Sequence, residues 1–83
     1  MPQVTIFSTT TCKYCKEVKE FLTAHNQAYE EILLDQKPEY IQESVALSGS
    51  RGVPVTKIVR DDGSVVGVLG WDQPALEEAL QLA

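Results

Sequence analysis

Two cysteines, Cys12 and Cys15, are the residues of this sequence best suited to covalent chemistry. They are the only cysteines in the chain, and two residues separate them. Thiols at this spacing can close a small disulfide ring and open it again by thiol–disulfide exchange. A zinc site is disfavoured, because zinc takes four protein ligands and His25 is the only histidine that could join the pair. The spacing therefore favours redox chemistry and predicts no metal.

The cysteine pair lies where a predicted strand gives way to a predicted helix. Upstream, Val4–Phe7 is a short β-rich run, and downstream Val18 and Leu22 repeat at helical spacing. The first N–H groups of a helix are unpaired, and the helix dipole adds partial positive charge there. A thiolate at such a point is stabilised, and its pKa commonly falls to about 3.5–7.5. We therefore expect Cys12 to be the nucleophile and Cys15, on the inward apolar stripe, to be the resolving thiol.

Three lysines crowd the beginning of this predicted helix, at positions 13, 16 and 19. Cations at a helix N-terminus interact unfavourably with the helix dipole, so we looked for a role that would explain these lysines. For Lys13, the immediate neighbour of Cys12, the favoured reason is a raised local potential that favours the thiolate, and a solvated exposed face is the alternative. Lys16 and Lys19 are interpreted as solvated helix residues.

Composition limits the classes of function that the chain can have. A length of 83 residues is that of one domain, residues 1–83, and a net charge of −5 argues against nucleic acid or anionic lipid as the main partner. No apolar run approaches the roughly 20 residues of a membrane span. Residues 1–4 enter a strand directly and carry no signal-peptide pattern. These features predict a cytoplasmic protein, in which a CxxC pair is more often catalytic or metal-binding than structural.

The remaining chain reads as alternating strands and helices. A helix that links two strands favours a parallel pair, and the turn Asp61–Ser64 favours an antiparallel hairpin. Asp72 is a candidate cap for the last helix. In the predicted helix 39–47, the apolar residues, Ile41 among them, are expected in the core. The predicted elements are helix 13–25, strand 28–34, helix 39–47, strand 56–59, strand 65–69 and a last helix that follows Asp72.

This order, with CxxC after the first strand, resembles the glutaredoxin family of the thioredoxin fold over essentially the full chain. Cys12-Lys13-Tyr14-Cys15 is similar to the family motif, which usually reads Cys-Pro-Tyr-Cys. The resemblance implies a minimal thioredoxin fold: a four-stranded mixed sheet of order 2-1-3-4, flanked by three helices. It also implies reduction of disulfides through Cys12 and Cys15, with no tightly bound cofactor and with glutathione as co-substrate.

Two later motifs extend the resemblance. Val53-Pro54 is similar to the family's Thr-Val-Pro, in which the proline is cis and the preceding backbone faces the active site. Trp71-Asp72, after Gly70, resembles the turn that holds the γ-glutamyl end of glutathione. The resemblance therefore implies that these four residues, together with Tyr14, contact glutathione or another substrate. Trp71 has a packing role as an equal alternative.

The sequence departs from the glutaredoxin pattern three residues before the first cysteine. A Lys or Arg at that position commonly binds the glycine carboxylate of glutathione, and here it is Thr9. Arg51, three residues before Pro54, resembles the spacing in NrdH-redoxins, which are reduced by thioredoxin reductase and supply electrons to ribonucleotide reductase. Their Trp-Ser-Gly-Phe-Arg-Pro turn is only loosely matched by residues 69–74.

The predicted function is thus a glutaredoxin-like thiol–disulfide oxidoreductase, and the NrdH-redoxin type is its alternative. The expected partners are glutathione or thioredoxin reductase and disulfide-containing proteins, ribonucleotide reductase among them, for a monomeric protein. A carrier of metal or iron–sulfur clusters is the alternative from another class. A [2Fe–2S] cluster needs four thiolates, so a dimer would be required, and glutaredoxins of that kind typically have Ser in place of Cys15.

Overall fold

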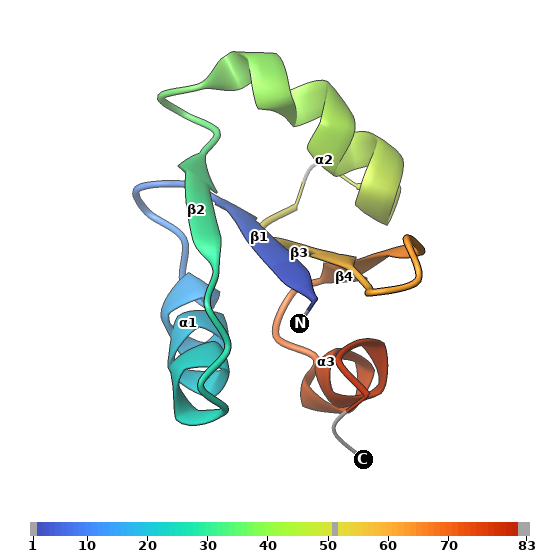
Figure 1. Ribbon diagram of the computed structural model, residues 1–83. Coiled ribbons are helices and arrows are strands. Elements are labelled where there is room, and N and C mark those ends of the chain that lie inside the picture. Colours follow the sequence, from blue (N-terminus) through green and yellow to red (C-terminus); the bar gives the residue numbers. More distant parts are fainter. Residues whose placement is uncertain (1, 51, 82–83) are drawn as a thin grey trace.

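The computed structural model describes residues 2–50 and 52–81 of the chain. Its elements follow the order β1, α1, β2, η1, α2, β3, β4, α3, in which η1 is a single 3₁₀ turn (Figure 1). None of the helices in these two ranges combines the length and the apolar character that crossing a membrane requires. The bounds of all these strands and helices are β1 Gln3–Ser8, α1 Cys15–Ala24, β2 Glu30–Leu33, η1 Pro38–Tyr40, α2 Ile41–Ser48, β3 Val55–Val59, β4 Val65–Leu69 and α3 Gln73–Ala79.

The four strands form one mixed sheet of order β2-β1-β3-β4, as predicted. β1 pairs in parallel with β2 and antiparallel with β3, and β3 pairs antiparallel with β4. β1 is central because Ile6 and Phe7 are apolar and face opposite sides, and both are buried. Gly63, at a φ of 88°, allows the tight turn that joins β3 to β4.

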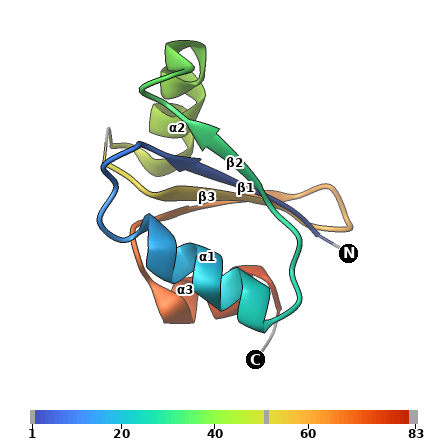
Figure 2. The same ribbon diagram turned by 90° about the vertical axis from the view of Figure 1, so that its left-hand side faces the viewer.

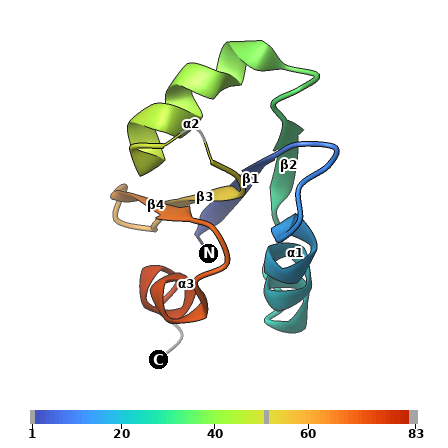
Figure 3. The ribbon, with the colours of Figure 1, turned by 180° about the vertical axis from the view of Figure 1, so that it is seen from behind.

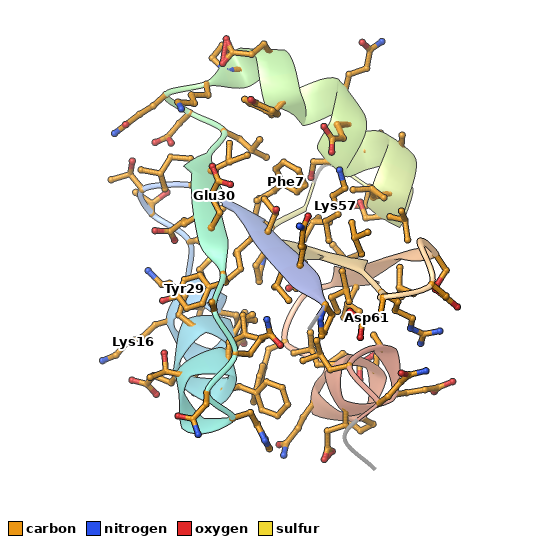
Figure 4. The ribbon with its side chains drawn as sticks, in the orientation of Figure 1. Phe7, Lys16, Tyr29, Glu30, Lys57 and Asp61 are labelled. Atoms are coloured by element: carbon orange, nitrogen blue, oxygen red, sulfur yellow. A yellow bond between two sulfur atoms is a disulfide. The ribbon has the colours of Figure 1, made fainter. Side chains whose placement is uncertain are left out.

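The helices cover both faces of the sheet. α1 and α3 lie on one face and α2 on the other (Figures 1 and 3). The α1/α3 side holds the larger core, and the α2 side a smaller one around Phe7, which lies between the sheet and α2 (Figure 4). The larger core consists of Val4, Ile6, Val18, Phe21, Leu22, Ile58, Val68, Leu76, Ala79 and Leu80.

Polar contacts fix the outer helices to the sheet. The buried Ser8 hydroxyl donates to Glu31 of β2 at 3.0 Å, and Lys19 of α1 lies 3.1 Å from the same carboxylate oxygen. Arg60 donates to the carbonyl oxygens of Ala79 and Glu78, at the C-terminal end of α3, where a cation is favoured. These contacts hold α1 against β2 and α3 against the end of β3.

Helix α1 begins at Cys15, two residues later than the predicted start at residue 13. The chain first makes a turn in which the N–H of Cys12 donates to Thr9, and the first helical bond runs from Val18 to Tyr14. The prediction for Ile41 was wrong: its side chain is 37% exposed rather than in the core. The 3₁₀ turn before it has three residues per turn, so it places Tyr40 against Phe7 and rotates Ile41 outward.

Gly67 is required by the close approach of α2 to β4. A Cβ at this position would lie 2.6 Å from the carbonyl oxygen of Leu47. Gly67→Ala should therefore lower the free energy of unfolding by about 1–3 kcal/mol, as overpacking does in well-packed cores. Urea denaturation would measure the change. Gly52→Ala is the matched control, since a Cβ there meets only ordinary contacts at 3.4 and 3.6 Å. Equal stabilities of the two variants would contradict this account of Gly67.

Candidate functional site

Cys12 and Cys15 form a disulfide in the structure, at the junction of β1 and α1. Their sulfur atoms are 2.01 Å apart and their Cα atoms 5.6 Å apart. Cys12 is half-buried, whereas Cys15 is 4% exposed and shares the inward stripe of α1 with Val18 and Leu22. The predicted inward orientation of Cys15 is confirmed, and of the two residues only Cys12 is partly exposed. The roles of nucleophile and resolving thiol remain predictions.

The first turn of α1 offers uncapped donors beside the disulfide. Tyr14 is the N-cap residue, and its side chain makes no capping hydrogen bond. Within the described residues, the backbone N–H groups of Cys15, Lys16 and Glu17 also donate no hydrogen bond. Unpaired N–H groups at a helix N-terminus stabilise a nearby anion. We therefore expect this end of α1 to favour a thiolate at Cys12 once the disulfide is reduced.

The loop before Cys12 is fixed to the end of β2. The N–H of Thr10 donates to Oδ2 of Asp35 at 3.2 Å. A hydrogen bond from the Thr10 side chain, with this backbone bond, lowers the pKa of the Asp35 carboxyl from its ordinary value of 3.8. Asp35 is exposed and therefore carries its negative charge at neutral pH, close to the residues that precede the reactive pair.

The Val53–Pro54 peptide bond is cis, as the resemblance implied. The carbonyl oxygen of Pro54 accepts from the N–H of Gly70 at 2.7 Å, and Val55 pairs with Phe7 of β1 and with Leu69 of β4. No partner for the backbone N–H or C=O of Val53 exists among residues 2–50 and 52–81. Both groups are therefore available to an extended chain.

Three loops meet at the same end of the sheet. The loop from β1 to α1, the segment before β3 and the connection from β4 to α3 lie together there (Figure 2). Thr9 and Val53 come from the first two of these loops and line one groove. The structure thus brings the disulfide and the cis-proline segment to one side of the molecule, although the two motifs are far apart in the sequence.

Two of the remaining predicted site residues, Asp72 and Trp71, have structural roles that the structure shows directly. Asp72 caps α3, because its Oδ1 accepts from the N–H of Ala75 at 3.2 Å. Trp71 packs edge-on against Phe21 at 5.7 Å between ring centroids, which accounts for its partial burial. Tyr14 is 47% exposed. Contact of these residues with glutathione remains a prediction, and Arg51 lies outside the described residues.

Sequence reasoning missed a groove beside the disulfide. Thr9, Leu34, Asp35, Ile41 and Val53 line this groove, which has a volume of about 330 Å³. The sequence gives only a weak indication for Asp35, namely that an acidic residue directly after a strand can reach the neighbouring loop. The sequence gives no indication that Ile41 lines a groove, because its helical spacing indicates a core position. Among the described residues, no cluster of three or more His, Cys, Asp or Glu side chains is placed to hold a metal ion.

Lys13 is an exposed cation next to the disulfide. Its Nζ lies 5.5 Å from the centroid of the Tyr14 ring, and it forms no ion pair with any residue that the structure describes. Lys16 and Lys19, in contrast, approach Glu20 and Glu31. Among the described residues, Lys13 is therefore the lysine of this group whose charge no ion pair takes up, and its action on Cys12 remains a prediction.

Lys13→Glu should raise the pKa of the Cys12 thiol in the reduced chain and slow its reaction at neutral pH. The reason is the reversal of charge beside the sulfur, and the effect should weaken as salt screens exposed charges over about 8–10 Å. Thiolate absorbance in the ultraviolet, followed against pH in low salt, measures the change. Lys16→Glu provides the control for net charge. If both variants titrate like the wild type, Lys13 is only a solvated helix residue.

Comparison with known proteins agrees with this site. The family model described as Glutaredoxin matches residues 4–62. The glutaredoxin-like protein NrdH of Lactococcus lactis subsp. lactis (strain IL1403) is 38% identical over 64 residues, which cover 77% of this chain and 85% of the relative. A glutaredoxin of Pseudomonas aeruginosa (strain PAO1) is 39% identical over 54 residues, which cover 65% of this chain and 64% of the relative.

Solved structures show the same relationship. The crystal structure of the glutaredoxin from Archaeoglobus fulgidus superposes with a TM-score of 0.78 at 30% identity and covers 98% of this chain and 88% of its own. Methanoredoxin of Methanosarcina acetivorans, at 23% identity and a TM-score of 0.75, shares the fold and covers 94% of this chain and 83% of its own. The chain therefore belongs to the glutaredoxin family, and its Cys12–Cys15 pair makes it a thiol–disulfide oxidoreductase.

Proposed function

We propose that this protein carries electrons to disulfides of other proteins and is itself reduced by a flavoprotein thioredoxin reductase in preference to glutathione. The main support for this choice of reductant is the charge of the groove beside the disulfide. Thr9 occupies the position where glutaredoxins commonly have a base, and the one charge that the described lining residues contribute is the Asp35 carboxylate. An anion there disfavours the glycine carboxylate of glutathione.

The chemistry proceeds by two exchanges of sulfur bonds. The Cys12 thiolate attacks one sulfur of the substrate disulfide, so a mixed disulfide forms and the other substrate sulfur leaves as a thiolate. The Cys15 thiolate then attacks Sγ of Cys12, which closes the Cys12–Cys15 disulfide and releases the second substrate thiol. Two electrons have passed to the substrate. The reductase returns two electrons, and two protons from water complete the thiols.

The orientation of the site supports these roles. The uncapped end of α1 stabilises the first thiolate, and Cys15, buried below it, is placed to react within the chain rather than with solvent species. The backbone groups of Val53, which have no partner among residues 2–50 and 52–81, can pair with an extended substrate segment, which aligns its sulfur with Cys12. The resemblance to NrdH-redoxins, which the similarity to NrdH relatives supports, favours thioredoxin reductase as the source of electrons and ribonucleotide reductase as one recipient. A monomeric state and a cytoplasmic location belong to the same proposal.

Glutathione is the second candidate reductant. The family resemblance implies contacts of the tripeptide with Asp72 and with the backbone of Val53, and the cis bond at Val53–Pro54 supports the second of them. The cap that Asp72 makes with Ala75 uses Oδ1 and leaves the other oxygen without a described hydrogen bond. Glutathione could thus bind through part of the family's contacts, and more weakly than to a glutaredoxin with the full basic set.

A pair of coupled assays tests the proposed reductant. One contains thioredoxin reductase and NADPH, the other glutathione, glutathione reductase and NADPH, and both use the same protein disulfide as final acceptor. We expect NADPH oxidation to depend on this protein mainly in the first assay. Rapid turnover with glutathione and none with thioredoxin reductase would contradict the proposal and favour the second candidate.

A further inference from the structure

The groove beside the disulfide has an apolar interior and a charged rim. Leu34 forms part of its wall, and Ile41 adds an apolar side chain that is 37% exposed. Asp35 stands at the rim, held by its hydrogen bond from Thr10. A large apolar side chain left open to water costs free energy that a bound apolar group would recover. The groove is therefore complementary to an apolar side chain with a cation next to it.

Two of the groove's lining residues belong to the segments that flank the reactive site. Thr9 belongs to the loop that leads into Cys12, and Val53 precedes the cis-proline. A substrate segment that pairs with the backbone N–H and C=O of Val53 would run along this edge, with alternate side chains facing the protein. A side chain close to the substrate half-cystine would then enter the groove, since Val53 both lines the groove and offers the backbone contact.

We propose that this groove, formed by Thr9, Leu34, Asp35, Ile41 and Val53, selects protein disulfides whose half-cystine is flanked by an apolar side chain and a Lys or Arg. The inference rests on the proposed function in one respect, that the substrate is a protein disulfide. The apolar part supplies affinity through burial. The Asp35 carboxylate supplies selectivity, because it attracts a cation and repels a carboxylate at the same position.

The charge of the groove separates this substrate class from glutathione. Glutathione has no apolar side chain for the groove, and its two carboxylates outweigh its single ammonium group, so its net charge is repelled by the Asp35 carboxylate. A peptide with leucine and lysine beside its cysteine satisfies both parts of the groove. The same five residues thus account for a preference among protein substrates and for a weak reaction with the tripeptide.

Single-turnover reduction of synthetic peptides tests the inference. The protein is first reduced with dithiothreitol and freed of it, so that the result does not depend on the natural reductant. Four cyclic disulfide peptides share one backbone and combine Leu or Gly with Lys or Glu beside one half-cystine; the first carries Leu and Lys, the second Gly and Glu, and the other two are the mixed pairs. We expect the first peptide to react about tenfold faster than the second. Equal rates, or faster reaction of the second peptide, would overturn the inference.

Variants assign the preference to the groove. Ile41→Ser should remove the preference for Leu over Gly, and Asp35→Lys should reverse the preference for Lys over Glu. Val65→Ser is the matched control, because Val65 is also an exposed apolar residue, 50% accessible, and lies on β4 outside the groove. Loss of both preferences in the control, or their survival in both groove variants with unchanged circular dichroism, would contradict the assignment.

The outcomes also separate this inference from the proposed function. If the peptides react at equal rates while thioredoxin reductase still reduces the protein, the groove inference fails and the proposed function stands. If the peptide preference holds while only glutathione reduces the protein, the proposed reductant is wrong and the groove still selects substrates. Weakening of the Lys preference at high salt is expected, because the rim charge is exposed.

Discussion

Cys12→Ser should abolish the reduction of every disulfide substrate, protein or small molecule. A serine hydroxyl at this position cannot replace a thiolate as the attacking group, because it remains protonated at neutral pH and forms no mixed disulfide. The loss should reach the background rate of the assay. Reduction of insulin and of a small aromatic disulfide, each followed by thiol release, would measure it.

Cys15→Ser should have a different effect from Cys12→Ser. Its first exchange should proceed, because Cys12 and the uncapped end of α1 are unchanged. The second exchange lacks its nucleophile, so turnover with protein disulfides should stop while reactions of small glutathione mixed disulfides can continue. Full loss in Cys15→Ser together with residual activity in Cys12→Ser would reverse the assignment of roles.

Thr9→Lys should increase turnover with glutathione and leave turnover by thioredoxin reductase nearly unchanged. The new cation would lie in the groove that now carries only the Asp35 charge among its described lining residues. A charge-assisted hydrogen bond is worth about 1.5–3 kcal/mol at a protected site and less in an open groove. We therefore expect up to about a tenfold gain in kcat/KM for glutathione.

Two comparisons make this result specific. Thr23→Lys adds the same charge at an exposed position near the far end of α1, and it should leave the glutathione reaction unchanged. Arg51→Ala tests whether this basic residue, rather than one at position 9, already binds the glycine carboxylate of glutathione. Rapid reaction of the wild type with glutathione, no gain in Thr9→Lys and a large loss in Arg51→Ala would show that Arg51 makes this contact.

The periodic parts of the fold could be predicted from the sequence. The spacing of Cys15, Val18 and Leu22 placed the second cysteine on the buried face of α1, and the structure confirms it. The sheet order and the cis bond at Val53–Pro54 were expected from the family resemblance, and both are present. These features depend on local patterns or on motifs whose order alone is informative.

The features that were missed depend on tertiary geometry. Ile41 has core-like spacing, yet the 3₁₀ turn before α2 shifts its phase and leaves it in the groove. Asp35 contacts Thr10, which lies 25 positions earlier in the chain. No local pattern encodes the rotation of a helix or a contact between two loops. The groove, which carries the proposed selectivity, therefore became visible only in the folded chain.

The most direct test of the two-step mechanism is the mass of the species trapped by Cys15→Ser. The reduced variant is mixed with a protein disulfide, quenched with acid and analysed as intact protein and as peptides. The account predicts a covalent adduct of the variant with the substrate, linked through Cys12 and released by dithiothreitol. Absence of any adduct while the wild type reduces the same substrate would contradict attack by Cys12 as the first step.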